Sequence, residues 1–499
     1  MKKSILWMGF LLMYLNHGEA TNFYVRSSGL DSNDGLSFAK AFKTIQSATN
    51  RVKSGDSVFV FDGIYKGFDH FYKGSGTAGN EIVYMAMGNQ VVVNQSCGRG
   101  FDGINIEGAN YIQLIGFKVT RIFDLSGSGE DGIRVVLADH ITVKHCEVDS
   151  CYRGIFTGYS DHFLAENNIC KNSYGEHGIY VSNNSDHVVI RYNQCFGNFR
   201  AAGIQLNPDL SSGAPGISKD VWIHHNICYN NRIGLNLQGI YDSYVYNNLI
   251  YNNGMGGGGN GITLFHGDAA TGCNNVKVYH NTVVVPATSQ WAILAIESDS
   301  LFVYNNILLS LSPKGCLDIE TSCSNYFSDY NLLNDRMTIN QGSSYINFKE
   351  WQNLGHDLNS TLISDNNSVF ENLVNLNFHL KPGSSAINKG TPAVMNLVTN
   401  DLDLIQRPQG TGFDIGCYEM KETVRNTNIS NQIKPVWLNH QLNFPALQDH
   451  QEVILFDLYG KTIGRGRTFD KHSLVNGIIL YSIFDKKTGR YLGSGSIFN

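Results

Sequence analysis

The sequence predicts an all-β protein, a right-handed parallel β-helix with three short strands in each coil. Stretches that read Gly-apolar-any-apolar recur at intervals of 22, 24 and 25 residues from Gly132 to Gly203, and of 31 and 27 residues as far as Gly261. A second apolar stretch that ends in asparagine follows most of them. The chain has 52 glycines and only 16% charged residues, which suits many short strands and turns. Such periods indicate a solenoid whose coils stack about 4.8 Å apart.

Equivalent positions of the repeat are expected to form columns along the solenoid. Asparagine tolerates left-handed backbone and can hydrogen-bond its own kind in stacked turns. Two residues beyond this column lie cysteines that we expect to be buried free thiols in one inward stack. Three Asp-His pairs fill one turn of consecutive coils and predict stacked, solvated imidazoles rather than a zinc site. These columns comprise Asn168, Asn193, Asn226, Asn248, Asn281, Asn306 and Asn331; Cys170, Cys195 and Cys228; and His140, His162 and His187.

The beginning of the chain predicts export and a capped solenoid. Residues 1–20, "MKKSILWMGFLLMYLNHGEA", combine a lysine pair, a short apolar run and small residues, as in a secretory signal peptide. We therefore expect a protein that is secreted or attached to the cell surface, without a membrane span. From Ala41 to Val52 an apolar stripe at helical spacing predicts an N-terminal cap helix. The net charge of -6 gives no support for a nucleic-acid partner.

The stretch "NFYVRSSGLDSNDGLSFAKAFKTIQSATNRVKSGDSVFVFDGIYKG", with "GSGTAGNEIVYMA" after it, resembles the opening of secreted β-helix proteins of the pectate lyase-like superfamily. That group contains polysaccharide lyases, glycoside hydrolases and epimerases. Residues 21–335 are then the capped β-helix, and 336–420 are similar to segments that close such helices by packing on the last coils. Residues 421–499 resemble the C-terminal sorting domain of type IX secretion substrates; a carbohydrate-binding or generic β-sandwich module is the alternative.

The candidate active site lies on the outward face of the first strand of each coil, because alternate residues of a strand point to opposite sides. Arg134 and Arg153 lie on neighbouring coils and are expected to meet a substrate carboxylate. His177, which titrates near neutrality, is expected to be the base, and Tyr180 a proton donor or acceptor. No rule of the repeat requires these residue types, because other residues fill the equivalent positions in other coils.

Two further groups of residues complete the predicted site. Amides suit the hydroxyls of sugars, so substrate-binding positions are assigned to Gln205, Asn207, Asn236 and Gln238. His266, which opens a loop at the border of this face, is assigned to substrate binding as well. Acidic residues of the turn before Gly132 are compatible with a Ca²⁺ ion that offsets carboxylate charge, although the sequence requires no cofactor. These metal candidates are Asp124, Glu130 and Asp131.

The expected function is a polysaccharide lyase that cleaves a uronic-acid-containing chain by β-elimination, with an acidic polysaccharide as partner and a monomeric state. A glycoside hydrolase, which needs two carboxyl groups across one bond, is the first alternative, with Glu130, Asp131, Glu176 and Asp209 near the same face. Coils such as "GEHGIYVS" are similar to those of mannuronan C5-epimerases, so a uronate epimerase is the second. A non-catalytic polysaccharide-binding surface protein is the third.

Overall fold

The computed structural model describes residues 20–122, 130–267, 269–394 and 396–421, and in the C-terminal part 435–438, 441–444, 447–456, 462–470, 474, 478–486 and 491–498. The predicted signal peptide, apart from its last residue, and the metal candidate Asp124 therefore lie outside the described residues. The chain divides into two compact units, Met1–Met420 and Lys421–Asn499, which we describe separately. In the described part, no helix is long and apolar enough to cross a membrane.

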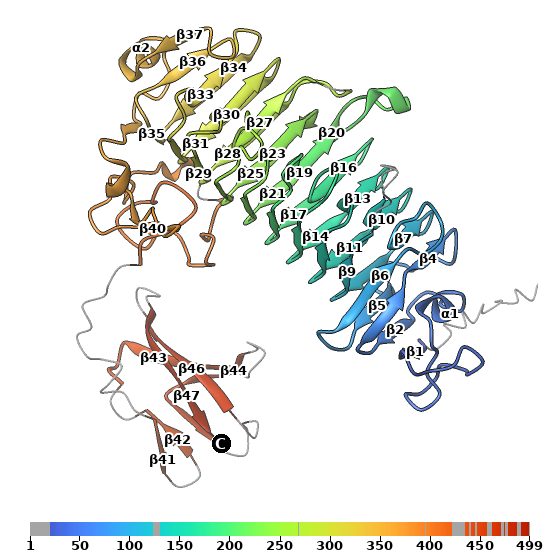
Figure 1. Cartoon of the computed structure of the whole chain (residues 1–499). Helices are drawn as coiled ribbons and strands as arrows, with labels where there is room; N and C mark the ends of the chain where they lie inside the picture. Colours follow the sequence, from blue (N-terminus) through green and yellow to red (C-terminus); the bar gives the residue numbers. More distant parts are fainter. Residues whose placement is uncertain are drawn as a thin grey trace, which may run out of the picture. The chain divides into compact units, whose positions relative to one another are not determined.

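The first unit is a parallel β-solenoid of about 11 turns, as the sequence predicts (Figure 1). Three long sheets run along it. Sheet 1 contains β4 (Phe68–Phe71), β7 (Ile104–Glu107), β10 (Asp131–Val136), β13 (Arg153–Gly158), β16 (Ile179–Ser182), β19 (Ala202–Asn207), β23 (Ile233–Gln238), β27 (Ile262–Phe265), β30 (Trp291–Ile296), β33 (Gly315–Ile319), β36 (Met337–Ile339) and, antiparallel, β37 (Ser344–Ile346).

Sheet 2 contains β1 (Asn22–Val25), β2 (Ser57–Val60), β5 (Ile82–Ala86), β8 (Ile112–Ile115), β11 (Ile141–Lys144), β14 (Leu164–Glu166), β17 (Val189–Arg191), β20 (Ser218–Lys219), β21 (Trp222–His224), β24 (Ile240–Tyr241), β25 (Tyr244–Tyr246), β28 (Asn274–Tyr279), β31 (Asp299–Tyr304) and β34 (Ser324–Asp329). Sheet 3 contains β3 (Gly63–Lys66), β6 (Val91–Gln95), β9 (Lys118–Thr120), β12 (Glu147–Asp149), β15 (Ile169–Lys171), β18 (Gln194–Phe196), β22 (Ile227–Tyr229), β26 (Leu249–Tyr251), β29 (Thr282–Val285), β32 (Ile307–Ser310), β35 (Leu332–Leu333) and β38 (Thr361–Leu362). Parallel pairing thus continues past residue 335, where the sequence places the end of the helix.

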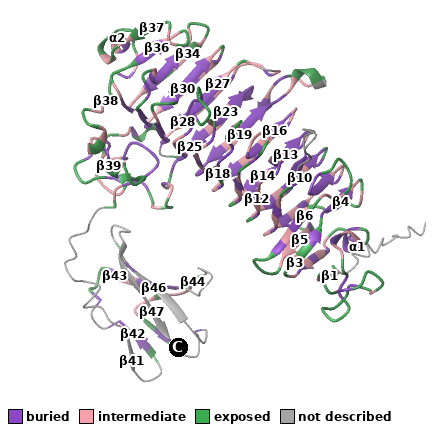
Figure 2. Cartoon of the chain, viewed as in Figure 1, coloured by how far each residue is buried: buried purple, intermediate pink, exposed green. Residues whose placement is uncertain are grey.

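The interior of the solenoid is one continuous apolar core. Ile133, Ile155 and Ile179 are directly paired on successive strands of sheet 1, and each is fully buried. Figure 2 shows buried strands and more exposed turns along the edges. Because alternate residues of a strand point outward, the register that fills the core also decides which side chains form the outer face of sheet 1.

The predicted asparagine column is confirmed. The backbone N–H of Asn226 donates to Asn248 Oδ1 at 3.0 Å, and the side chain of Asn248 donates to Asn281 Oδ1 at 2.9 Å. The same pattern extends from Asn168 to Asn331. Asn331 Nδ2 donates to the buried carboxylate of Asp357 at 2.9 Å. A second ladder, which sequence reasoning missed, links Asn198, Asn231 and Asn253.

The cysteine and histidine columns are confirmed as well. Cys170, Cys195 and Cys228 are paired on successive strands of sheet 3, and all three are buried free thiols. The His140 and His162 rings are stacked at a centroid distance of 4.3 Å, and His162 and His187 at 4.6 Å. Each of these three histidines has left-handed backbone, so one turn conformation repeats from coil to coil.

The cap helix is shorter than the predicted range 41–52. Helix α1 covers Ile45–Thr49 and begins after the N-cap Thr44, whose side chain accepts a hydrogen bond from Ser47. The residues before it are extended, because Phe42 pairs with Val25 of β1 and exchanges backbone hydrogen bonds with its neighbours. Phe42 and Ile45 are nevertheless buried in the end of the core, as expected of a cap.

The rest of the first unit packs on the last coils. It contains α2 (Phe348–Asn353), β39 (Phe370–Asn372), β40 (Asn377–Leu380) and the 3-10 turns η2 (Asn366–Ser368) and η3 (Pro392–Val394). A further 3-10 turn, η1 (Leu210–Ser212), lies in the long loop between β19 and β20. Residues 363–420, the closing segment, bury Phe370 and Phe378 against the outer side of sheet 3 at Leu249 and Ile307. The fully buried ion pair between Arg407 and Glu419, 2.6 Å apart, holds the end of this segment together.

The second unit contains two small antiparallel sheets. One comprises β41 (Val436–Leu438), β42 (Gln441–Asn443) and β45 (Thr468–Asp470), and the other β44 (Thr462–Gly466), β43 (Gln451–Phe456), β46 (Ile478–Asp485) and β47 (Tyr491–Phe498). It has its own apolar core, which includes Leu442, Val453 and Ile483.

Candidate active site

The outer face of sheet 1 has the register that the sequence predicts. Directly paired residues on its successive strands form the outward column Asn105, Arg134, Phe156, Tyr180, Gln205, Asn236 and Thr263. The residues that precede the recurrent glycine position of each strand form a second column beside it. This second column begins with Asp102, Asp131, Arg153 and His177, of which Asp131 and Arg153 are directly paired.

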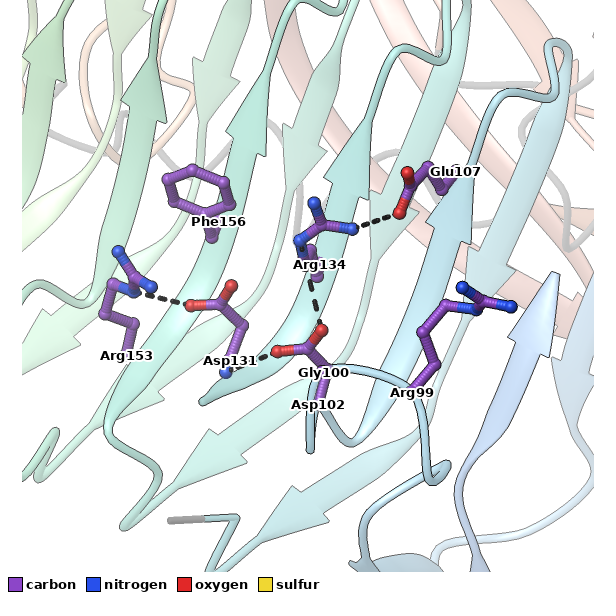
Figure 3. Close-up of a pocket in the computed structure, with 8 residues that line it drawn as sticks. All are labelled: Arg99, Gly100, Asp102, Glu107, Asp131, Arg134, Arg153 and Phe156. Carbon is purple, nitrogen blue, oxygen red and sulfur yellow. Dashed lines mark hydrogen bonds and ion pairs between the residues drawn. The ribbon is translucent and has the colours of Figure 1, made fainter. Parts of the chain in front are cut away.

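A pocket of about 390 Å³ opens on this face over β7, β10 and β13 (Figure 3). Its lining contains three arginines and three carboxyl groups, with the ring of Phe156 at one side. The lining residues are Arg99, Gly100, Asp102, Glu107, Asp131, Arg134, Arg153 and Phe156. The structure thus brings together two of the four predicted catalytic residues, Arg134 and Arg153, with carboxyl groups from the same and the preceding coils.

Each guanidinium of the pocket is oriented by a carboxylate. Arg134 donates to Glu107 at 2.5 Å and to Asn105 Oδ1 at 2.8 Å, and its Nε lies 3.9 Å from Asp102. Arg153 donates from Nε to Asp131 at 2.6 Å, and its Cζ lies 4.7 Å from the centroid of the Phe156 ring. These contacts fix both cations at the floor of the pocket.

Two carboxyl groups of the pocket have perturbed proton affinities. Asp102 and Asp131 are buried, and the backbone N–H of Asp131 donates to Asp102 Oδ1 at 3.0 Å. Burial raises the pKa of both carboxyls above their usual range, and the nearby charge of Asp131 raises that of Asp102 further. Arg153 opposes the rise at Asp131. The arrangement therefore favours a proton on Asp102 and a negative charge on Asp131.

His177 and Tyr180 lie one coil beyond the pocket. Their rings meet edge to face with their centroids 4.9 Å apart, and the centroids of the Tyr180 and Phe156 rings are 5.4 Å apart. The backbone N–H of Ala202 donates to His177 Nδ1 at 3.1 Å, so the neutral ring carries its proton on Nε2. Burial and the charge of Arg153 lower the pKa of His177 to about 3, whereas burial raises that of Tyr180. This geometry favours a hydrogen-bond donor at His177 over the predicted base, because a base of so low a pKa is weak.

The predicted sugar-binding amides lie two and more coils beyond the pocket. Gln205, Asn207 and Gln238 are almost completely buried, and Asn236 Nδ2 donates to Gln205 Oε1 at 2.6 Å. Asn207 Nδ2 instead donates to the hydroxyl of Tyr180 at 3.4 Å, so this amide is linked to a predicted catalytic residue. His266 lies apart, where its exposed ring is hydrogen-bonded to Glu297 at 2.6 Å.

Of the predicted metal and hydrolase residues, Asp131 and Glu176 both contact Arg153, whereas Asp209 lies in a different loop. Asp131 is paired with Arg153, Glu130 is buried beside it in the chain, and Asp124 lies outside the described residues. No group of three or more His, Cys, Asp or Glu side chains in the described ranges is arranged to hold a metal ion. Glu176 lies 3.4 Å from Arg153, whereas Asp209 caps a 3-10 turn in a different loop.

Sequence reasoning missed Asp102, Glu107 and Arg99 as members of the site. Asp102 and Glu107 occupy columns that the sequence defines, so a search for charges across neighbouring coils would have found them. Arg99 comes from a loop, where it donates to Asp69 at 2.8 Å, and no repeat predicts its position.

Comparisons with known proteins support the fold. Residues 74–214 match the family model described as a right handed beta helix region, and the sequence matches no curated protein. The structure is similar to that of pectate lyase Pel9A, at 15% identity and a TM-score of 0.50, over 80% of this chain and 96% of that chain. It is also similar to a rhamnogalacturonan lyase, at 14% identity and a TM-score of 0.48, over 62% of this chain and 87% of that chain. A third similar structure is XylC in complex with xylose, at 10% identity and a TM-score of 0.49, over 80% of this chain and 99% of that chain. At 15% identity the likeness to pectate lyase Pel9A shows the fold alone, which agrees with the right-handed β-helix of the family model.

Proposed function

We propose that the protein is a carbohydrate-active enzyme that cleaves a uronate-containing polysaccharide by β-elimination in the pocket over β7, β10 and β13. One observation carries the proposal: two oriented guanidiniums, Arg134 and Arg153, lie beside two buried carboxyls of raised pKa, Asp102 and Asp131. The fold shared with a pectate lyase supports it. The reaction is that expected from the sequence, but the base is now assigned to Asp131 instead of His177.

The pocket contains the three functions that elimination from a uronate needs. The guanidinium of Arg134 would offset the substrate carboxylate and acidify the C5 proton. Asp131 would take that proton, and the C5–H electron pair would form the C4–C5 double bond. The C4–O bond would then break, with Asp102 giving its proton to the leaving oxygen. Because both carboxyls belong to the same column of sheet 1, the base and the acid would act from one face of the sugar, and the elimination would be syn.

A glycoside hydrolase is the second candidate, and a specific observation favours it. Asp102 and Asp131 occupy adjacent coils, the backbone N–H of Asp131 donates to the carboxyl of Asp102, and the two carboxyls differ in their charged surroundings. Two close carboxyls with separated proton affinities are also the arrangement of retaining glycosidases.

Incubation with pectate, alginate and glycosaminoglycans tests the proposal. Elimination gives products that absorb in the ultraviolet through the new double bond, whereas hydrolysis gives reducing ends without that absorbance. We expect absorbing products from the wild type, and a loss of at least about 100-fold in kcat for Asp131→Asn and Asp102→Asn, the lower range for an acid–base group. The matched control is Asp149→Asn, which removes a carboxylate from sheet 3. Reducing ends without absorbance would instead establish the hydrolase.

Export, surface attachment and the sorting role of residues 421–499 remain part of the proposal. They rest on the resemblance of residues 1–20 to a secretory signal peptide and of residues 421–499 to a type IX sorting domain. A requirement for Ca²⁺ is a separate proposal, and adding a chelator to the same assays tests it. The working state is proposed to be a monomer.

A further inference from the structure

Aromatic residues line one edge of sheet 1 beside the pocket. The backbone N–H of Tyr174 donates to the carbonyl of Cys151, so Tyr152 and Tyr174 occupy equivalent turn positions. The ladder through Ser173 and Asn198 places Phe199 at the same position one coil on. The fold does not require an aromatic residue there, because Arg232 and Gly254 follow the next two members of that ladder.

Two of these rings are unusually exposed, and a cation lies on one of them. Tyr174 is 48% and Phe199 53% exposed. The guanidinium of Arg200 lies 5.0 Å from the centroid of the Tyr174 ring. Within the described ranges Arg200 has no ion pair, whereas Arg134 and Arg153 are both held by carboxylates. An exposed cation on an aromatic face, without a carboxylate, is suited to an anionic ligand that also has an apolar surface.

This edge begins next to the pocket. Tyr152 directly precedes Arg153, which lines the pocket, and Tyr174 lies in the turn that leads to Glu176 and His177. From β13 to β19 is two steps of sheet 1, or about 10 Å. A polymer that has one sugar in the pocket can therefore reach Arg200 with a sugar further along.

We propose that Tyr174, Phe199 and Arg200, the rim, form a second subsite for an acidic sugar, with the pyranose ring against the aromatic side chains and its carboxylate on Arg200. This inference rests on the proposed function, and it names the substrate class: a polymer with uronate residues close together in the chain, rather than one with an isolated uronate among neutral sugars.

Binding to polygalacturonate and alginate by the full chain carrying Asp131→Asn, which prevents turnover, tests the rim. In that background Arg200→Gln weakens binding by about tenfold, the effect of losing one hydrogen bond between charged groups. Tyr174→Ala and Phe199→Ala weaken it as well. Lys219→Gln, which removes an exposed positive charge from β20 in sheet 2, leaves binding unchanged. In the otherwise wild-type enzyme, Arg200→Gln raises KM for the polymer and leaves kcat unchanged.

The rim is refuted if Arg200→Gln binds like the parent, if Lys219→Gln weakens binding equally, or if neither polymer binds. The inference can be separated from the proposed reaction. Binding that depends on Arg200 in a protein that forms no unsaturated product would support the subsite and contradict the elimination. Unsaturated product from the wild type together with unaltered binding by Arg200→Gln would support the elimination and contradict the subsite.

Discussion

At the scale of single residues, two features of its surroundings act in opposite directions on the pKa of Asp131. Burial raises its pKa, and Arg153 at 2.6 Å lowers it. Arg153 lowers this pKa more than Arg134 does, so removing its guanidinium in Arg153→Gln raises the pKa of Asp131. A base must be ionised to act, and the acidic limb of kcat/KM therefore moves to higher pH, by about one to three units. Lys171→Gln, which removes a paired cation from sheet 3, is the control. An unmoved limb in Arg153→Gln would show that Asp131 is not the base.

His177 provides a second test at this scale. Its Nδ1 accepts from Ala202, and its pKa is lowered to about 3, so the ring is neutral at any pH above about 4. We expect His177→Ala to lower kcat about 100-fold through the loss of a fixed hydrogen-bond donor to the bound sugar, without moving the acidic limb of the pH profile. His177→Gln, which keeps an N–H, should recover part of the activity. Disappearance of the acidic limb in His177→Ala would instead restore the base role predicted from the sequence.

At the scale of structural elements, the asparagine ladder stabilises the turns between sheets 2 and 3. Asn248→Ala removes the acceptor of the backbone N–H of Asn226 and one of the acceptors of its side chain, and it removes a donor to the carbonyl of Ile223. Because these groups are buried, we expect the free energy of unfolding to fall by about 3 kcal/mol or more. Gln194→Ala, at an exposed position of β18, should change it by less than about 0.5 kcal/mol. Urea unfolding measures both. Equal stabilities would mean that the ladder contributes nothing.

The columns were predictable because each coil places equivalent residues in one environment, so a single rule repeats in the sequence. The asparagine, cysteine and outward columns follow from that rule. The pocket does not, because it depends on charges from three coils and on Arg99 from a loop that no repeat describes. The cap helix was predicted too long for a similar reason: Phe42 satisfies the helical stripe, but its backbone pairs with β1, a contact that the local pattern does not contain.

At the scale of the whole molecule, the boundary between the two units predicts where the chain can be shortened. The first unit extends to Met420, and Arg407 and Glu419 form its buried ion pair. A chain that ends at Met420 should keep the activity of the full protein, whereas export or surface attachment should be lost. A chain that ends at residue 405 loses both ion-pair residues and should be strongly destabilised. Loss of activity in a folded chain that ends at Met420 would make the second unit part of the active site.

The central claim is that the pocket over β7, β10 and β13 performs β-elimination on a uronate polymer. The most direct measurement is ultraviolet absorbance during incubation of the wild type and Asp131→Asn with polygalacturonate and alginate, with reducing ends counted in the same samples. The account predicts absorbing products that increase in step with reducing ends for the wild type, and almost none for Asp131→Asn. Reducing ends without absorbance, or equal product from both proteins, would contradict it.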